Sequence, residues 1–212
     1  MPWQSSLEDR PEYVHAIGMI SIENANLELA LADLMATALS ISKRVAHAIY
    51  FTPRAAALRI DILEAAAKAK LTPKLSPDSK SGHDHPFVKQ KREALQKIIK
   101  LTKRSHGVTQ RRHDVIHDAW GVAYTDEELE TDREGSRPVI SSKLKVASFT
   151  EAQVVPITSL TDLVRDLRIL IDNIHSLGEE FRRHPPSMAD LRKSSTKSGS
   201  SARAVKDGKP AS

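Results

Sequence analysis

The chain has 212 residues, of which 40% are hydrophobic and 4% aromatic, and it contains no cysteine. The absence of cysteine excludes a disulfide framework, a thiolate zinc site and a cysteine nucleophile. An aliphatic, alanine-rich chain with so few aromatic residues favours packed helices over a β-sandwich. Because the first thirteen residues lack the pattern of a signal peptide, we expect a cytoplasmic protein with no membrane association.

The net charge of +5 is unevenly distributed. Residues 192–212 carry six basic residues and one acidic residue, which accounts for the whole excess. Nine basic residues and one acidic residue lie between Lys89 and Arg112, whereas six acidic residues and one basic residue lie between Asp126 and Glu134. A basic face attracts polyanions, and an acidic segment can shield or orient it. The alternative is that both segments are solvated surface.

The first half of the chain predicts three helices. Apolar residues three and four apart predict a long helix over residues 11–40, in which Glu23 and Asn24 interrupt the apolar stripe. A short helix is expected over residues 42–51. Thr52 and Pro53 are typical of an N-cap and a first turn, so a third helix is expected to run from there to about Lys70. Residues 72–86 contain three prolines and predict a polar connection.

The second half predicts a long helix, a hairpin and a closing helix. The long helix is expected over residues 87–118, with an inward line through Leu95, Ile98, Ile99, Thr102, His106, Thr109, His113, Ile116 and Trp120. Residues 120–124 and 138–146 predict two strands of a β-hairpin around the acidic turn 126–137.

A closing helix is expected to begin near Ser159, which forms a capping pair with Asp162. Its apolar stripe is a seam for another helix of this chain or of a second copy: Leu160, Leu163, Leu167, Leu170, Ile174, Leu177 and Phe181. We therefore expect a mostly α domain of about five helices over residues 11–184. Residues 1–10 form an N-terminal extension, and residues 185–212 a disordered basic tail.

The most informative motif is Arg-Arg-His-Asp-Val-Ile-His at residues 111–117. Arg112 is charged at every physiological pH and can bind two phosphate oxygens at once. His117 can take or give a proton near neutrality. A fixed positive charge beside a titratable base is a combination suited to a phosphate ester.

Helix geometry places Arg112 on the face that should be buried. With Ile116 at the middle of that face, Arg112 lies roughly 40° to one side, and His113 roughly 60° and His117 roughly 100° to the other. A guanidinium at such a position needs an anion, because an unpaired buried charge is very costly. One solution is an internal partner, with Glu23 first and Asp61 or Asp33 next. The other is a phosphate in a groove, between two subunits.

The motif resembles that of the HEPN superfamily, whose active members carry Arg, a polar residue, three to five further residues and His. Arg112, His113 and His117 match these positions, with His113 where Asn is commonest in the family. The long first helix with its internal Glu23 and the late position of the motif also resemble bacterial members. The inserted hairpin and acidic turn depart from the compact members.

The resemblance implies a metal-independent, cofactor-free ribonuclease that works as a homodimer, with both motifs facing one cleft. His117 would be the general base on the ribose 2′-hydroxyl, and Arg112 would stabilise the phosphate in the transition state. His113 would support them, and Glu23 could orient Arg112. The products would be 2′,3′-cyclic phosphate and 5′-hydroxyl ends. Binding of RNA without cleavage, and a toxin or defence role with an antitoxin partner, belong to the same interpretation.

Two other interpretations remain open at the level of sequence. His113 and His117 have the spacing of a zinc-binding pair, with His83, Asp84 and His85 as further ligands, although no catalytic Glu follows His113. Alternatively the protein is a non-catalytic helical homodimerisation or interaction module, in which Arg112 is structural and the leucine-rich closing helix has the main role.

Overall fold

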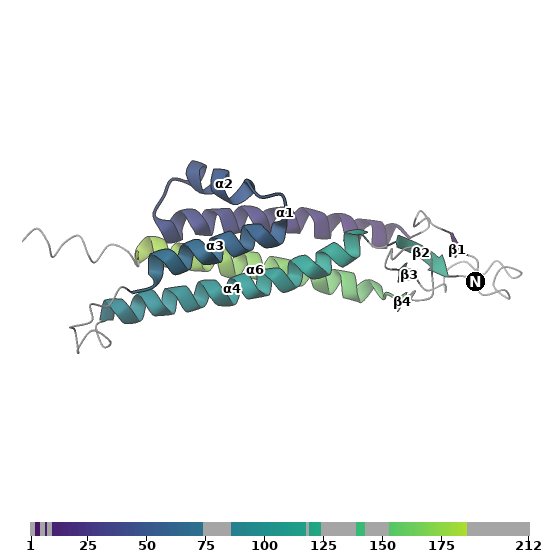
Figure 1. The fold of residues 1–212 in the computed structure, drawn as a ribbon. Helices are drawn as coiled ribbons and strands as arrows, with labels where there is room; N and C mark the ends of the chain where they lie inside the picture. Colours follow the sequence, from purple (N-terminus) through teal and green to yellow (C-terminus); the bar gives the residue numbers. More distant parts are fainter. Residues whose placement is uncertain are drawn as a thin grey trace, which may run out of the picture.

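The computed structural model describes residues 3–4, 7, 10–73, 86–117, 119–123, 139–142 and 153–185. Five α-helices dominate these residues (Figure 1), so the prediction of a mostly α fold is confirmed. The helices are α1 Pro11–Leu39, α2 Lys43–Phe51, α3 Ala56–Leu71, α4 Pro86–His117 and α6 Ile157–Arg183. The acidic turn 126–137 and residues 186–212 of the predicted tail lie outside the described residues.

The most extensive contact between two helices joins α1 and α6, which lie side by side and run in the same direction. Near the start of both helices, the Tyr13 hydroxyl donates a hydrogen bond to the Val155 carbonyl at 2.9 Å. About ten residues further along each helix, Arg168 pairs with Glu23. The seven apolar residues predicted for the closing helix are all buried. The partner of this seam is therefore within the same chain, chiefly α1.

α4 runs in the opposite direction to α6, and two ion pairs connect the helices. Lys97 pairs with Glu180, and Arg111 pairs with Asp166 at 2.7 Å. α3 packs along α4 with the Thr102 hydroxyl donating to Glu64 at 2.6 Å. α2 lies on the outside of α1, as Figure 1 shows. The four long helices thus surround one aliphatic core, and α2 adds a partial second layer.

Two predicted helix starts were wrong. α3 begins at Ala56, not at Pro53, because the Arg59 side chain bonds the carbonyls of Pro53 and Arg54 and holds them in a non-helical turn. α6 begins at Ile157, with Pro156 in the N-cap position. Proline is well tolerated at such a boundary, and the helix starts two residues before the predicted Ser159 cap.

The buried face of α4 is also rotated from the predicted line. The buried residues are Ala94, Ile98, Thr102, Ser105 and Val108. The predicted His113 is exposed, and His106 and Thr109 are half-buried. Ala94 and Ser105 thus face inward, while Leu95 and Ile99 of the predicted line are half-buried. Gly107 does not interrupt the helix.

Four short strands lie at the end of the bundle where α1 and α6 begin and α4 ends (Figure 1). They are β1 Trp3–Gln4, β2 Ala119–Ala123, β3 Val139–Ser142 and β4 Gln153–Val154. All neighbours pair antiparallel in the order β1-β2-β3-β4, and β2 and β3 overlap the predicted pair of strands. The connection 124–138 lies outside the described residues, so a hairpin turn stays a prediction.

None of the helices in the described part of the chain is both long and apolar enough to span a lipid bilayer.

Candidate functional site

Arg112 lies near the end of α4, on the line of the helix that buries Ile98, Thr102 and Val108 further back. The side chain is half-buried, as the sequence predicted for this face. Its Nε atom is buried and has no hydrogen-bond partner. The described residues provide this guanidinium with no ion pair or hydrogen bond at all. A half-buried guanidinium that needs an anion therefore has no partner among the described residues.

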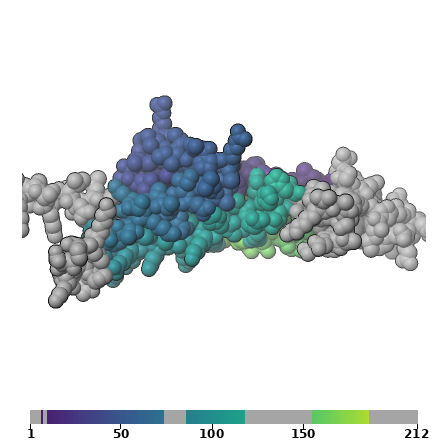
Figure 2. Space-filling model, in the orientation of Figure 1, coloured from purple at the N-terminus to yellow at the C-terminus, as the bar shows by residue number. Residues whose placement is uncertain are grey.

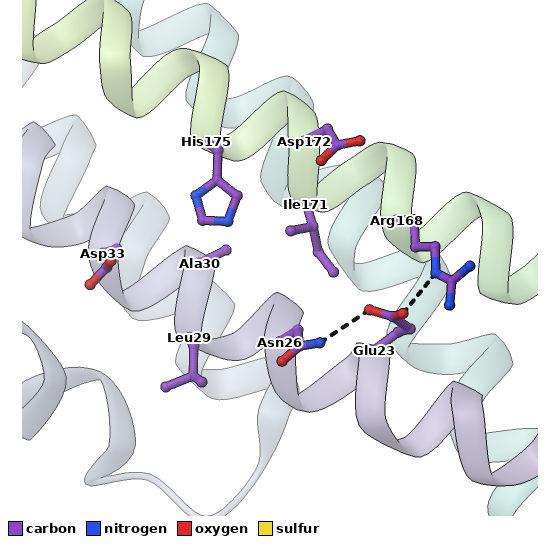
Figure 3. Close-up of a pocket in the computed structure, with 9 residues that line it drawn as sticks. All are labelled: Glu23, Asn26, Leu29, Ala30, Asp33, Arg168, Ile171, Asp172 and His175. Carbon is purple, nitrogen blue, oxygen red and sulfur yellow. Dashed lines mark hydrogen bonds and ion pairs between the residues drawn. The ribbon is translucent and has the colours of Figure 1, made fainter.

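Glu23 is not that partner, contrary to the first of the predicted pairings. Its carboxylate accepts a hydrogen bond from Arg168 Nε at 2.7 Å and a second from Asn26 Nδ2 at 3.1 Å (Figure 3). The hydrogen bond from Arg168 holds the pKa of Glu23 below its usual value. Glu23 thus lies against α6, and its carboxylate pairs with Arg168 and Asn26 instead of Arg112.

The other two predicted partners are engaged elsewhere as well. Asp61 Oδ1 lies 3.0 Å from the His106 ring, and Asp33 pairs with Lys43 and His47 on α2. All three carboxylates proposed from the sequence are therefore paired with other cations or imidazoles. Within the described part of the chain, none of the three pairs with Arg112.

Arg112 and His113 line a groove of about 640 Å³ between α1, α3 and α4. In Figure 2 a strip of α1 (purple) is visible between the start of α3 (blue) and the C-terminal end of α4 (teal). The groove lies beside the start of α3 at Ala56 and the last turns of α4. Its charged lining consists of three arginines and one carboxylate: Arg54, Arg59, Arg112 and Glu28.

His117 is exposed at the last residue of α4 and is not part of the groove lining. Its ring centroid lies 4.4 Å from that of His113, one helical turn earlier. His113 therefore links the two predicted catalytic groups, because it lines the groove with Arg112 and contacts the His117 ring. Arg112 and His113 thus share the groove, and His117 is connected to it only through its contact with the His113 ring.

The mouth of the groove is fixed by Arg59. Its guanidinium donates to Glu28 at 2.7 Å and to the carbonyls of Pro53 and Arg54 at 2.8 and 3.2 Å. It also lies over the Phe51 ring, 5.4 Å from the ring centroid. These contacts neutralise the one carboxylate that lines the groove and anchor the turn before α3. Arg54 is left exposed, and its side chain makes no hydrogen bond or ion pair with the described residues.

Asn24 was not identified as a site residue from the sequence. It lines the groove and is only 7% exposed, yet its Oδ1 atom has no hydrogen-bond partner. A buried amide is almost always hydrogen-bonded, so this one stands out. The signal that could have identified it is the interruption of the apolar stripe of α1 at Glu23 and Asn24, of which only Glu23 was assigned a role.

The basic residues of α4 do not form a single face. Lys97, Lys100 and Arg104 line a separate hollow against α6, together with Glu180. Arg111 points to α6 and pairs with Asp166. Of the basic residues that the sequence grouped together, Arg112 is the one that lines the groove between α1, α3 and α4.

Among the residues that the structure describes, no three His, Asp, Glu or Cys side chains gather closely enough to hold a metal ion. The further ligands suggested for a zinc site, residues 83–85, lie outside the described residues.

Compared with known protein families, with curated proteins and with solved structures, the chain has no significant match.

Proposed function

We propose that the protein is a metal-independent endoribonuclease of HEPN type, with Arg112, His113 and His117 as its catalytic residues. The observation that carries the proposal is the half-buried Arg112 guanidinium, which lines a groove and has no partner in the described structure. An unpaired cation in such a place is costly unless an anion or water solvates it. A phosphodiester is an anion that the planar guanidinium can bind through two oxygens.

The chemistry follows from the residue types. His117 takes the proton of a ribose 2′-hydroxyl, and the 2′-oxygen forms a bond to the adjacent phosphorus. The bond from phosphorus to the 5′-oxygen breaks, and that oxygen takes a proton from solvent water as it leaves, while His117 returns its own proton to solvent. Arg112 stabilises the negative charge that builds on the phosphate in the transition state. In this proposal His113 binds the same phosphate, which is supported by the 4.4 Å between its ring centroid and that of His117. The products are 2′,3′-cyclic phosphate and 5′-hydroxyl ends.

The HEPN resemblance extends the proposal to a homodimer. His117 is exposed in the single chain, and a second copy that brought its own motif to the same cleft would enclose both histidines. The toxin or defence role and the antitoxin partner are consequences of the resemblance alone. Light scattering of the full-length protein tests the dimer, because a monomer at micromolar concentration would contradict it.

The catalytic proposal is tested by incubating the full-length protein with total RNA in the presence of a metal chelator. We expect cleavage that leaves 2′,3′-cyclic phosphate ends. The His117→Ala and Arg112→Ala variants should lose activity by about 10²–10³-fold or more, the usual loss when one transition-state contact is removed. His15→Ala, which removes an exposed histidine of α1 outside the groove, is the matched control and should retain full activity.

Intact RNA at every concentration of wild-type protein would contradict the proposal, as would equal loss in the His15 control. The thermal midpoint of each variant separates catalysis from folding. Because His117 is exposed, its removal should leave the midpoint almost unchanged.

A second candidate function is a helical interaction protein without catalysis. Exposed aliphatic residues on α2 and α3 favour it, since Val45 and Ile49 lie one turn apart on α2 and Leu58 is 51% exposed. Exposed aliphatic residues indicate a protein-binding surface when they form a continuous patch, and single ones are common on any protein surface. Two results together would favour this function over the nuclease. The wild-type protein would leave RNA intact, and the Ile49→Lys variant would differ from it in oligomeric state.

A further inference from the structure

The groove contains more polar groups than a single scissile phosphate requires. Its volume of about 640 Å³ lies in the range of sites that bind small organic molecules rather than a lone anion. Besides Arg112 and His113, it is lined by the first residues of α3, by Arg54 and by Asn24. These three features have no role in the cleavage chemistry proposed above.

The start of α3 is suited to a phosphate. The N-cap residue is Ala55, whose side chain provides no capping hydrogen bond. The N–H groups of the first turn have no acceptor within the helix, and the positive end of the helix dipole lies at the same place. Ala55, Ala56 and Ala57 line the groove, and their methyl groups leave the backbone accessible. Arg54 adds an exposed guanidinium without a partner among the described residues.

Asn24 gives an independent indication of a ligand in the same groove. Its side chain is more than nine-tenths buried, and its amide makes no hydrogen bond with any residue that the structure describes. An amide carries a donor and an acceptor side by side, and so does the edge of a nucleobase. Asparagine pairs with adenine through two such hydrogen bonds in many nucleic-acid complexes.

We propose that the groove is a nucleotide subsite, in which the start of α3 and Arg54 bind a phosphate and Asn24 contacts the base of the same nucleotide. This inference rests on the proposed function, since the nucleotide belongs to the RNA strand whose next phosphate lies at Arg112. The subsite assigns a substrate preference to the chain, with adenine preferred at the position beside the cleaved bond.

Binding of uncleavable strands tests this assignment separately from catalysis. The probes are fluorescent decamers of adenosine and of uridine in which every 2′-hydroxyl is methylated, and the readout is anisotropy with the full-length protein. Wild type should bind the adenosine strand more tightly. Asn24→Leu should reduce the preference by about tenfold, the discrimination of one paired base edge.

Arg54→Ala should act differently, because a phosphate contact carries no base information. It should weaken the binding of both strands equally, by about tenfold. The slope of log affinity against log salt concentration should fall by about one released counterion. Arg44→Ala is the matched control, since Arg44 is an exposed arginine of α2 outside the groove and should leave both affinities unchanged. Arg54 is exposed, so its variant should fold normally even if Asn24→Leu does not.

The outcomes distinguish the two proposals. If both strands bind, weaken on Arg112→Ala and are unaffected by the Arg54 and Asn24 changes, the subsite is wrong and the proposed function stands. If wild type binds neither strand, both are wrong. If adenosine monophosphate binds as tightly as the decamer, the ligand of the groove is a free nucleotide and not an RNA strand, and the inference is wrong.

Discussion

Two neighbouring residues of α1 have opposite surroundings. Glu23 faces α6 and is fully hydrogen-bonded, to Arg168 and to Asn26. Asn24, the next residue, faces the groove between α1, α3 and α4 and has no hydrogen-bond partner for its buried oxygen. The α1–α6 seam thus satisfies Glu23 within the chain, whereas the groove leaves Asn24 Oδ1 and Arg112 Nε without a partner among the described residues.

The contrast indicates that these two polar groups of the groove do not contribute to the stability of the fold. A buried polar group left unpaired costs about 1–3 kcal/mol, a large part of the stability of a domain of this size. The seam shows that this fold can satisfy a buried charge when the geometry requires it. Two polar groups in this groove have no partner among the described residues, and a ligand is the explanation that we propose for them.

The largest expected effect is on the seam itself. Leu170→Ala in α6 removes a side chain with no exposed surface and should lower the free energy of unfolding by about 2–5 kcal/mol. Ile169→Ala, one residue earlier and 42% exposed, is the control and should change it by about 0.5 kcal/mol or less. Urea unfolding followed by circular dichroism measures both. Equal losses in the two variants would mean that α6 packs in another orientation.

A smaller effect concerns the Glu23–Arg168 pair and depends on pH. Because Arg168 lowers the pKa of Glu23 in the folded state, the pair stabilises the protein above the ordinary glutamate value of 4.5. That contribution is lost as the pH falls through the lowered folded-state pKa. In the Glu23→Gln variant, the thermal midpoint should therefore fall less steeply as the pH is lowered into the acid range. An unchanged acid limb would show that the pair is not formed in solution.

The smallest expected effect has the opposite sign. Asn24→Leu replaces an unpartnered buried amide by an apolar side chain of similar shape and should stabilise the free protein by about 1 kcal/mol. Asn26→Leu, which removes the hydrogen bond to Glu23, is the control and should be neutral or destabilising. Differential scanning calorimetry without RNA measures both. Destabilisation by the Asn24 change would mean that water or the protein itself satisfies the amide.

The sequence predicted the helices well because periodicity is a local property. α1 and α4 were placed within one residue at each end, and the apolar stripe of α6 was correct throughout. The half-buried position of Arg112 was also predicted, since helix geometry places it on the inward face, whereas His113 is exposed. Helix starts were less predictable, because Arg59 holds residues 53–54 outside α3 through bonds that no local pattern reveals.

The partners of charged residues could not be predicted. Whether Arg112 meets Glu23 depends on how α1 and α4 are rotated about their own axes, and one position along a helix changes the direction by about 100°. The interruption of the α1 stripe correctly marked Glu23 and Asn24 as unusual. Only the packing of α6 on one flank and of α4 on the other decides that the carboxylate is structural and the amide faces the groove.

Arg59 holds the turn before α3 by bonding backbone carbonyls, which every residue type possesses. The identities of residues 53 and 54 can therefore change without loosening the anchor. Neither residue belongs to the buried core, so their side chains can be exchanged at little thermodynamic cost. The fold thus provides a tolerant position at the groove entrance, where directed evolution could alter ligand selectivity while the scaffold stays intact.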